Sequence, residues 1–144
     1  MESRTHPNRL GIRGWVGGGR WGFERYVYTL HRITGLGLLL YFLLHIFVTS
    51  ARVYGPASWQ NAMNSVTGPA FKFGEYLVFA AFAFHAVNGI RLGMIELGFW
   101  VGRPIEPVYP YATSVGRQRP IAIAVMLIAG VLAVWGGYNF IFMD

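Results

Sequence analysis

The sequence predicts an all-α membrane protein with three transmembrane helices. Of its 144 residues, 54% are hydrophobic and only 12% are charged. Soluble globular proteins carry about 25% charged residues, so this shortage of charge indicates a membrane environment. Three apolar segments separated by polar loops supply the spans, which we expect at about residues 26–51, 71–98 and 120–143.

The three segments differ in how far they are free of charge. The stretch 33–51 has 19 charge-free residues, 76–90 has 15, and 120–143 has 24. A helix needs about 20 mostly apolar residues to cross a bilayer, so only the third segment reaches this length with charge-free residues alone. Polar residues at the ends of the first two must snorkel to the interface or face protein. Pro120 is expected to begin the third helix, because proline suits the first helical turn.

The arginine distribution predicts the orientation. Six arginines lie in the segment up to Arg32, the loop 91–119 has four, and the loop 52–72 has two basic residues. Since basic loops stay inside, the N-terminus is expected in the cytoplasm and the C-terminus outside. A bacterial or archaeal plasma membrane is favoured over the mitochondrial inner membrane.

Residues 1–25 are basic and Gly-rich and are expected to form a cytoplasmic tail before one membrane domain, 26–144. A mobile tail fits the glycines of this segment. Trp15, Trp21 and Phe23 fit equally well a tail held at the membrane interface or on a partner.

The composition also excludes several classes of protein. The chain has no cysteine, which rules out disulfides, thiolate-bound zinc, protein-held iron–sulfur clusters and covalent c-type haem. The net charge of +6 could suggest nucleic acid. The hydropathy and the lack of a recognition motif argue against it. Arginines at a membrane edge bind phosphates and carboxylates of lipids or cofactors instead.

The second span places His85 on a face of mostly small residues. At 100° per residue, the residues within about 40° of one direction are Gly74, Val78, Ala81, His85, Gly89, Leu92 and Glu96. The bulky Phe79 and Phe84 point elsewhere, which leaves room for a flat apolar group such as a porphyrin. On periodicity alone, a histidine hydrogen-bonded to a neighbouring helix is the favoured interpretation.

The first span carries a polar stripe: His31, Thr34, Leu38, Tyr41, His45, Thr49 and Arg52. Polar groups facing lipid are costly, so this stripe is expected to face protein or a cofactor. Arg32 points nearly opposite to His45 and needs a different partner. Counted from Arg32 and Arg91, helix rise puts His45 roughly 10 Å further out than His85. The two histidines are therefore not expected to bind one metal.

A third pattern concerns helix contact. Ala129, Ala133 and Gly137 recur at spacing four in the third span, which suits close approach of a second helix. That helix could belong to this chain or to another subunit.

Two motifs on successive spans carry a family resemblance. "LHRITG" (residues 30–35) begins the first span. "FHAVNGIRLGMIELG" (84–98) has the pattern H-x3-G-I-R, with an acid eleven residues after the histidine. With these motifs, residues 24–140 resemble the cytochrome b556 membrane-anchor subunits of succinate dehydrogenase, or succinate:quinone oxidoreductase, and their fumarate reductase relatives.

The resemblance implies an assembly. The three helices would form half of a haem-binding bundle with a second membrane-anchor subunit. An iron–sulfur subunit and a flavoprotein subunit would complete respiratory complex II of the tricarboxylic acid cycle. The flavoprotein oxidises succinate, and electrons pass through iron–sulfur clusters to menaquinone or ubiquinone. This chain would have no succinate-oxidising site and no catalytic residue of that step.

The resemblance also implies roles for single residues. His85 would be an axial ligand of haem b, paired with a histidine of the second anchor subunit. His45 resembles the first-span ligand of two-haem members, so two haems are favoured over one, and one over none. At the inner end, the residues expected near the haem propionates or quinone are His31, Arg32 and Arg91, with Glu96, Tyr28 and Thr29 as possible quinone neighbours.

Two rival functions remain open on the sequence. A purely structural, non-haem anchor would use its histidines only for hydrogen bonds between helices. A transporter or channel subunit would use the polar stripe of the first span as a lining.

Overall fold

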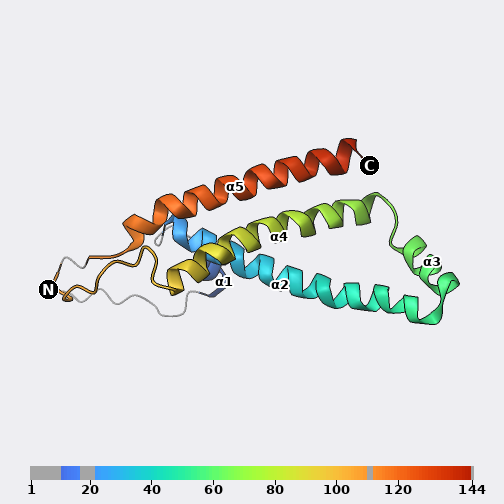
Figure 1. The fold of residues 1–144 in the computed structure, drawn as a ribbon, viewed down its shortest axis with the longest axis horizontal. Coiled ribbons are helices and arrows are strands. Elements are labelled where there is room, and N and C mark those ends of the chain that lie inside the picture. Colours follow the sequence, from blue (N-terminus) through green and yellow to red (C-terminus); the bar gives the residue numbers. More distant parts are fainter. Residues whose placement is uncertain (1–10, 17–21, 110–111, 144) are drawn as a thin grey trace.

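Three long helices dominate the computed structural model, which describes residues 11–16, 22–109 and 112–143. They are α2 (Phe23–Ser50), α4 (Pro69–Glu96) and α5 (Val115–Phe142), as Figure 1 shows. Shorter elements are α1 (Gly11–Val16), the 3-10 helix η1 (Ala51–Tyr54) and α3 (Pro56–Ser65). The described ranges contain no strand, and the three long helices are long and apolar enough to cross a membrane. The prediction of an all-α membrane protein is confirmed.

The first span begins earlier than expected. Helix α2 starts at Phe23 rather than at residue 26, because Phe23 packs against a buried cluster of Val27, Phe84 and Ala129. The expected boundary between tail and membrane domain therefore falls inside a helix. Trp21 and the side chain of Trp15 lie outside the described residues.

The expected start of the third span at Pro120 is wrong. Helix α5 begins at Val115, where the Thr113 hydroxyl accepts a hydrogen bond from the Val115 amide at 3.1 Å. The Ser114 carbonyl accepts from the amides of Arg117 and Gln118. With the first turn fixed by Thr113 and Ser114, Pro120 falls in the second turn, where its missing N–H removes a single backbone bond.

Glycine–proline pairs begin α3 and α4, the next two α-helices after α2. We call the end of the long helices that carries α3 the outer end and the opposite end the inner end, after the predicted orientation. Gly55 precedes Pro56 of α3 with a φ of 99°, and Gly68 precedes Pro69 of α4 with a φ of 120°. Glycine adopts this left-handed conformation without a Cβ clash, and proline suits the first helical position. With these two pairs the chain reverses its direction between α2 and α4.

Helix α5 runs alongside α4 through small residues. Ala122, Val125, Ala129 and Gly136 are its buried positions. The ring of Phe79 lies against Gly136, and the ring of Tyr76 lies against Gly137. Ala129 and Gly137 of the predicted stripe thus pack within this chain. Lipid is as apolar as these side chains, so close packing, rather than burial from water, holds the helices together.

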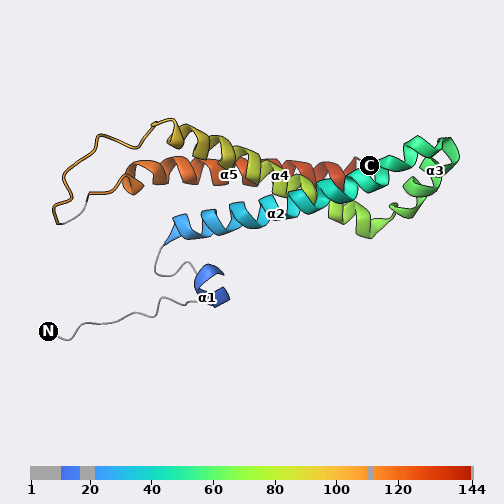
Figure 2. The same ribbon diagram turned by 90° about the horizontal axis from the view of Figure 1, so that it is seen from below.

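Helix α2 approaches α4 differently. The two helices meet in their inner halves and diverge toward the end that carries α3 (Figures 1 and 2). Near the inner end, Glu24 of α2 binds Arg119 of α5 with two contacts of 2.6 and 3.1 Å. Helix α2 is therefore joined to the other two long helices mainly in its inner half, whereas α4 and α5 also pack further out.

Candidate functional site

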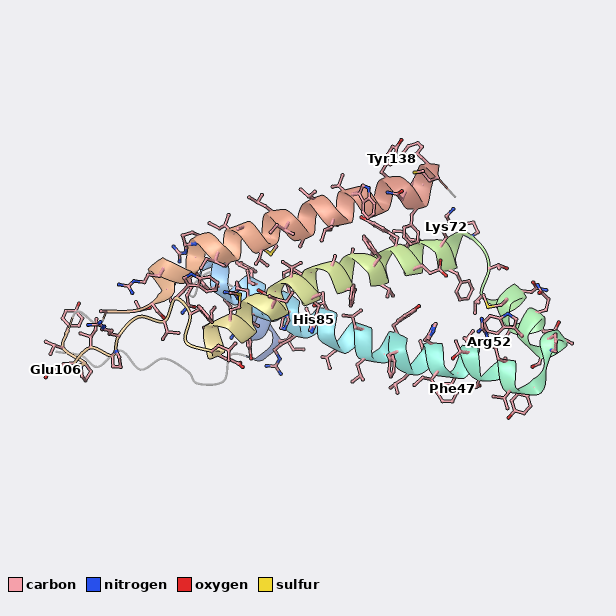
Figure 3. All side chains as sticks on the ribbon, viewed as in Figure 1. Phe47, Arg52, Lys72, His85, Glu106 and Tyr138 are labelled. Atoms are coloured by element: carbon pink, nitrogen blue, oxygen red, sulfur yellow. The ribbon has the colours of Figure 1, made fainter. Side chains whose placement is uncertain are left out.

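His85 lies where α2 and α4 meet (Figure 3). Its Nδ1 is 3.1 Å from the backbone oxygen of His31 and 3.2 Å from the Thr34 hydroxyl. A carbonyl oxygen only accepts hydrogen bonds, so Nδ1 must carry the proton and donate it. Nε2 then keeps its lone pair, and it has no hydrogen-bond partner among the residues that the structure describes. This is the arrangement that suits metal ligation through Nε2.

The sequence of α2 makes room for this ring. A Cβ on Gly35 would lie 2.8 Å from Cε1 of His85, closer than such atoms approach one another. The Thr34 hydroxyl is itself held by contacts with the carbonyls of Leu30 (2.9 Å) and His31 (3.0 Å). It donates to these carbonyls and accepts from His85, which fixes the imidazole orientation.

His31 stacks on His85. The ring centroids are 4.0 Å apart, with an angle of 6° between the planes. Nδ1 of His31 is buried and has no hydrogen-bond partner within the described ranges. The sequence placed both residues at the inner part of the protein but did not predict that they touch, because the register between two helices is not encoded in the periodicity of either.

A mostly apolar groove of about 800 Å³ begins at His85 and follows the divergence of α2 and α4. Tyr41 and Glu75 are its other polar side chains; the remaining lining residues are Gly35, Leu38, Leu39, Phe42, Val78, Phe79, Phe82, Ala86 and Phe140. Its volume lies in the range of about 300–1,000 Å³ typical of cofactor sites. An imidazole with a free Nε2 on the wall of a large apolar groove fits a porphyrin.

His45 is not part of this arrangement. Its side chain is exposed, its nearest ring is that of Tyr41 at 5.6 Å, and it does not line the groove. His85 is level with Thr34, which lies 11 residues before His45 on α2, or roughly 16 Å of helix rise.

The expected separation of roughly 10 Å between the two histidines was therefore too small. Gly89 of α4 lies beside His31, so Arg91 lies further inward than Arg32. The expected separation of His45 and His85 assumed that Arg32 and Arg91 are level, and it was too short for this reason.

The remaining residues expected at the inner end differ in their surroundings. The Tyr28 hydroxyl accepts a hydrogen bond from Arg32 at 2.7 Å, on an exposed surface, and Thr29 is buried. Arg91 is half-buried. Glu96 is exposed at the end of α4, with no hydrogen bond or ion pair to any residue that the structure describes.

Asn88 is a site residue that the sequence did not predict. Its side chain is fully buried, and its Oδ1 accepts a hydrogen bond from Nε of Arg91 at 2.9 Å. The available signal was an amide three residues from an arginine on the same helix, inside an apolar stretch. Within the described ranges, no three His, Cys, Asp or Glu side chains gather as a metal site.

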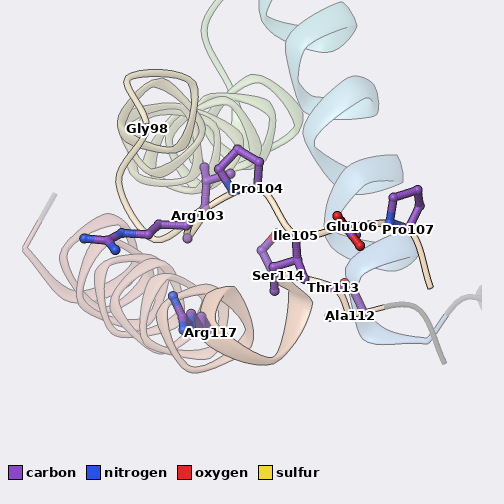
Figure 4. A pocket seen from close by; sticks show the side chains of 12 residues that line it. Gly98, Arg103, Pro104, Ile105, Glu106, Pro107, Ala112, Thr113, Ser114 and Arg117 are labelled. Carbon is purple, nitrogen blue, oxygen red and sulfur yellow. The ribbon is translucent and has the colours of Figure 1, made fainter. Parts of the chain in front are cut away.

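A second cavity lies at the inner end of the protein. It is open to one side, has a volume of about 870 Å³, and is lined by the loop after α4 and the start of α5 (Figure 4). Arg103, Glu106 and Arg117 are its charged side chains. It is separate from the groove that begins at His85.

Comparison with known proteins identifies the family. Residues 16–134 match the family described as "Succinate dehydrogenase/Fumarate reductase transmembrane subunit". The chain belongs to this family. The resemblance that rested on two motifs is thereby confirmed over most of the sequence, and the three apolar helices are those of an integral membrane protein.

Individual relatives of this transmembrane subunit family come from bacteria and archaea. The "Succinate dehydrogenase 2 membrane subunit SdhC" of Mycobacterium tuberculosis is 30% identical over 74 residues, 51% of this chain and 53% of that protein. The "Succinate dehydrogenase hydrophobic membrane anchor subunit" of Halobacterium salinarum is 30% identical over 101 residues, 67% of this chain and 76% of that protein.

A protein of the same description from Archaeoglobus fulgidus is 29% identical over 73 residues, 51% of this chain and 62% of its own length. The chain therefore spans less than two thirds of the length of the mycobacterial and Archaeoglobus relatives. No solved structure matches it significantly.

Proposed function

We propose that this chain is a haem b-carrying membrane anchor of a succinate:quinone oxidoreductase and helps to form its quinone site. The proposal rests on one observation above all: Nδ1 of His85 donates to the His31 carbonyl, which leaves the Nε2 lone pair free on a residue that lines the groove. Membership in the transmembrane subunit family supplies the setting. The named relatives are membrane subunits of succinate dehydrogenase.

His85 would hold the haem iron from one side, and a histidine of a second anchor subunit would hold it from the other. A haem with two such ligands carries single electrons and has no open iron position. Thr34 and the His31 carbonyl orient the ligand imidazole through its Nδ1 proton, as is common for metal-bound histidines. Gly35 keeps the approach to the ring open.

His45 would serve a second haem nearer the outer face. The spacing along α2 is too large for His45 and His85 to share one iron. The exposed His45 ring faces no partner within the described residues except Tyr41. A second anchor subunit packed on the outer half of α2 would supply the second ligand.

The quinone site would lie at the inner end. To the vicinity of quinone or the haem propionates we assign Tyr28, Thr29, His31, Arg32 and Arg91. Glu96, exposed at the end of α4, is a further candidate. Arginine guanidinium groups and a tyrosine hydroxyl suit carboxylate and carbonyl oxygens respectively. The iron–sulfur subunit would deliver electrons to this cytoplasmic side.

A structural, non-haem anchor is the second candidate, because the contacts of His85 with Thr34 and His31 also join two helices. The test is a reduced-minus-oxidised spectrum of the purified complex. We expect a b-type signal in the wild type and its loss in His85→Ala, while the flavoprotein and iron–sulfur subunits still co-purify. A wild-type complex without a b-type signal would leave the structural anchor as the function.

A further inference from the structure

Asn88 occupies an unusual position for an amide. It is 0% exposed, in the helix that also carries His85. Its Oδ1 accepts the Nε proton of Arg91 at 2.9 Å, and its Nδ2 is buried without a hydrogen-bond partner in the part of the chain that the structure describes. Burying an amide with an unpaired donor is costly, so a purely packing role would be served better by an apolar side chain of similar size.

Arg91 is left with its terminal nitrogens available. Its Nε is bound by Asn88, and no other hydrogen bond or ion pair joins it to the residues that the structure describes. Glu24, an acid that could otherwise pair with it, is bound at both carboxylate oxygens by Arg119. Arg91 is also half-buried, so its guanidinium is a partly desolvated cation whose orientation is fixed at one nitrogen.

We propose that Asn88 is a positioning residue for Arg91. Its carboxamide holds Nε, so that the two terminal nitrogens bind an acceptor oxygen of the ligand at the inner end. Arg91 lies six residues beyond His85, or about 9 Å by helix rise. The oxygen belongs to a porphyrin carboxylate or to a quinone carbonyl. The identity of this ligand rests on the proposed function, whereas the positioning itself does not.

The test compares four single variants and the double variant Asn88→Leu/Arg91→Gln in the purified complex. Asn88→Leu keeps the number and branching of the heavy side-chain atoms and removes the acceptor, and Asn88→Asp keeps an acceptor oxygen at the same place. Arg91→Gln removes the guanidinium. Val125→Ala is the packing control, because Val125 is a buried apolar side chain on α5. The measurements are the KM for quinone against kcat, the haem reduction potential and the thermal midpoint.

We expect Asn88→Leu to raise the quinone KM about fivefold to twentyfold with little change in kcat, if the oxygen is that of quinone. A shifted haem potential at unchanged haem content would assign it to the porphyrin carboxylate. In either case Asn88→Asp should restore most of the wild-type value. The change should also disappear in the Arg91→Gln background, because coupled residues are not additive.

The proposal is overturned if Asn88→Leu behaves like Val125→Ala in both the quinone KM and the haem reduction potential. It is also overturned if the effect of Asn88→Leu adds to that of Arg91→Gln. A wild-type complex without haem or succinate:quinone activity would defeat the proposed function alone. The positioning would then still be tested by the thermal midpoints of the two single variants and the double variant. Additive midpoints would reject it.

Discussion

The two halves of α2 carry the same polar stripe but find different surroundings. In the inner half, His31, Thr34 and Gly35 pack against His85 of α4. In the outer half, the side chains from Tyr41 to Phe47 are all exposed, and Phe47 is 75% exposed. Polar groups in a membrane need partners, whereas bulky apolar groups can face lipid. The polar side chains in the inner half of α2 have partners within the chain, and under the proposed function those of Tyr41 and His45 in the outer half would find them in another chain or a cofactor.

Helix α4 explains this difference, because it changes partner along its length. Its outer half packs through Phe79 and Tyr76 on Gly136 and Gly137 of α5. Its inner half packs against α2, where Gly35 and Gly89 make the space for His85 and His31. Glycines thus determine both contacts, and the divergence of α2 from α4 creates the groove beside His85.

The largest effect on the stability of the complex is expected from a substitution of Gly35. A Cβ there collides with the His85 ring, so Gly35→Ala should displace the imidazole and destabilise the complex by about 1–3 kcal/mol, as overpacking does. Gly37→Ala is the matched control, since its added Cβ would meet no described atom within 4 Å apart from the backbone of its own helix. It should be neutral or stabilising by up to about 1 kcal/mol.

Thermal unfolding and haem content of the two glycine variants check this difference. Equal loss of haem in both would show that the close approach of Gly35 to His85 is unimportant.

A smaller effect is expected at Thr34. Thr34→Val removes the hydroxyl that accepts from His85, and a hydrogen bond of this kind contributes about 1 kcal/mol. Thr49→Val is the control, because the Thr49 hydroxyl binds only carbonyls of its own helix, those of His45 and Ile46. The haem spectrum should change in Thr34→Val alone. A change of the same size in Thr49→Val would assign the effect to the helix rather than to His85.

The smallest effect is expected at the ion pair between α2 and α5. The side chains of Arg119 and Glu24 are 52% and 30% exposed. Exposed pairs contribute about 0–1 kcal/mol and are screened by salt. Glu24→Gln should therefore lower the thermal midpoint slightly at low salt and hardly at all at high salt. A large, salt-independent loss would mean that the pair supports the bundle more than its exposure suggests.

Much of the fold follows from the sequence, because charge-free length and the positions of arginines are local properties. Three spans were predicted, and the described residues contain three helices long and apolar enough to cross a membrane, but Pro120 was wrongly taken as the start of α5. The Thr113 hydroxyl and the Ser114 carbonyl determine that start by accepting hydrogen bonds from the first turn, and this outweighs a proline one turn later.

The candidate site was predicted less completely. Periodicity placed His85 and Gly89 on one face and His31 and Thr34 on another. It could not show that these faces meet, nor that the His85 proton lies on Nδ1. Asn88 was passed over because its partner, Arg91, becomes evident only when burial is known. The height of His45 was misjudged for a related reason, since it depends on the register of α2 against α4.

The haem-to-flavin ratio of the purified complex, in wild type, His85→Ala and His45→Ala, tests the central claim most directly. We predict that His85→Ala removes the haem at the inner groove and that His45→Ala removes a second haem while the first is kept. If His45→Ala alone leaves haem content and spectrum unchanged, only the second haem is rejected. A His85→Ala complex with the full wild-type haem content and spectrum would contradict the central claim itself.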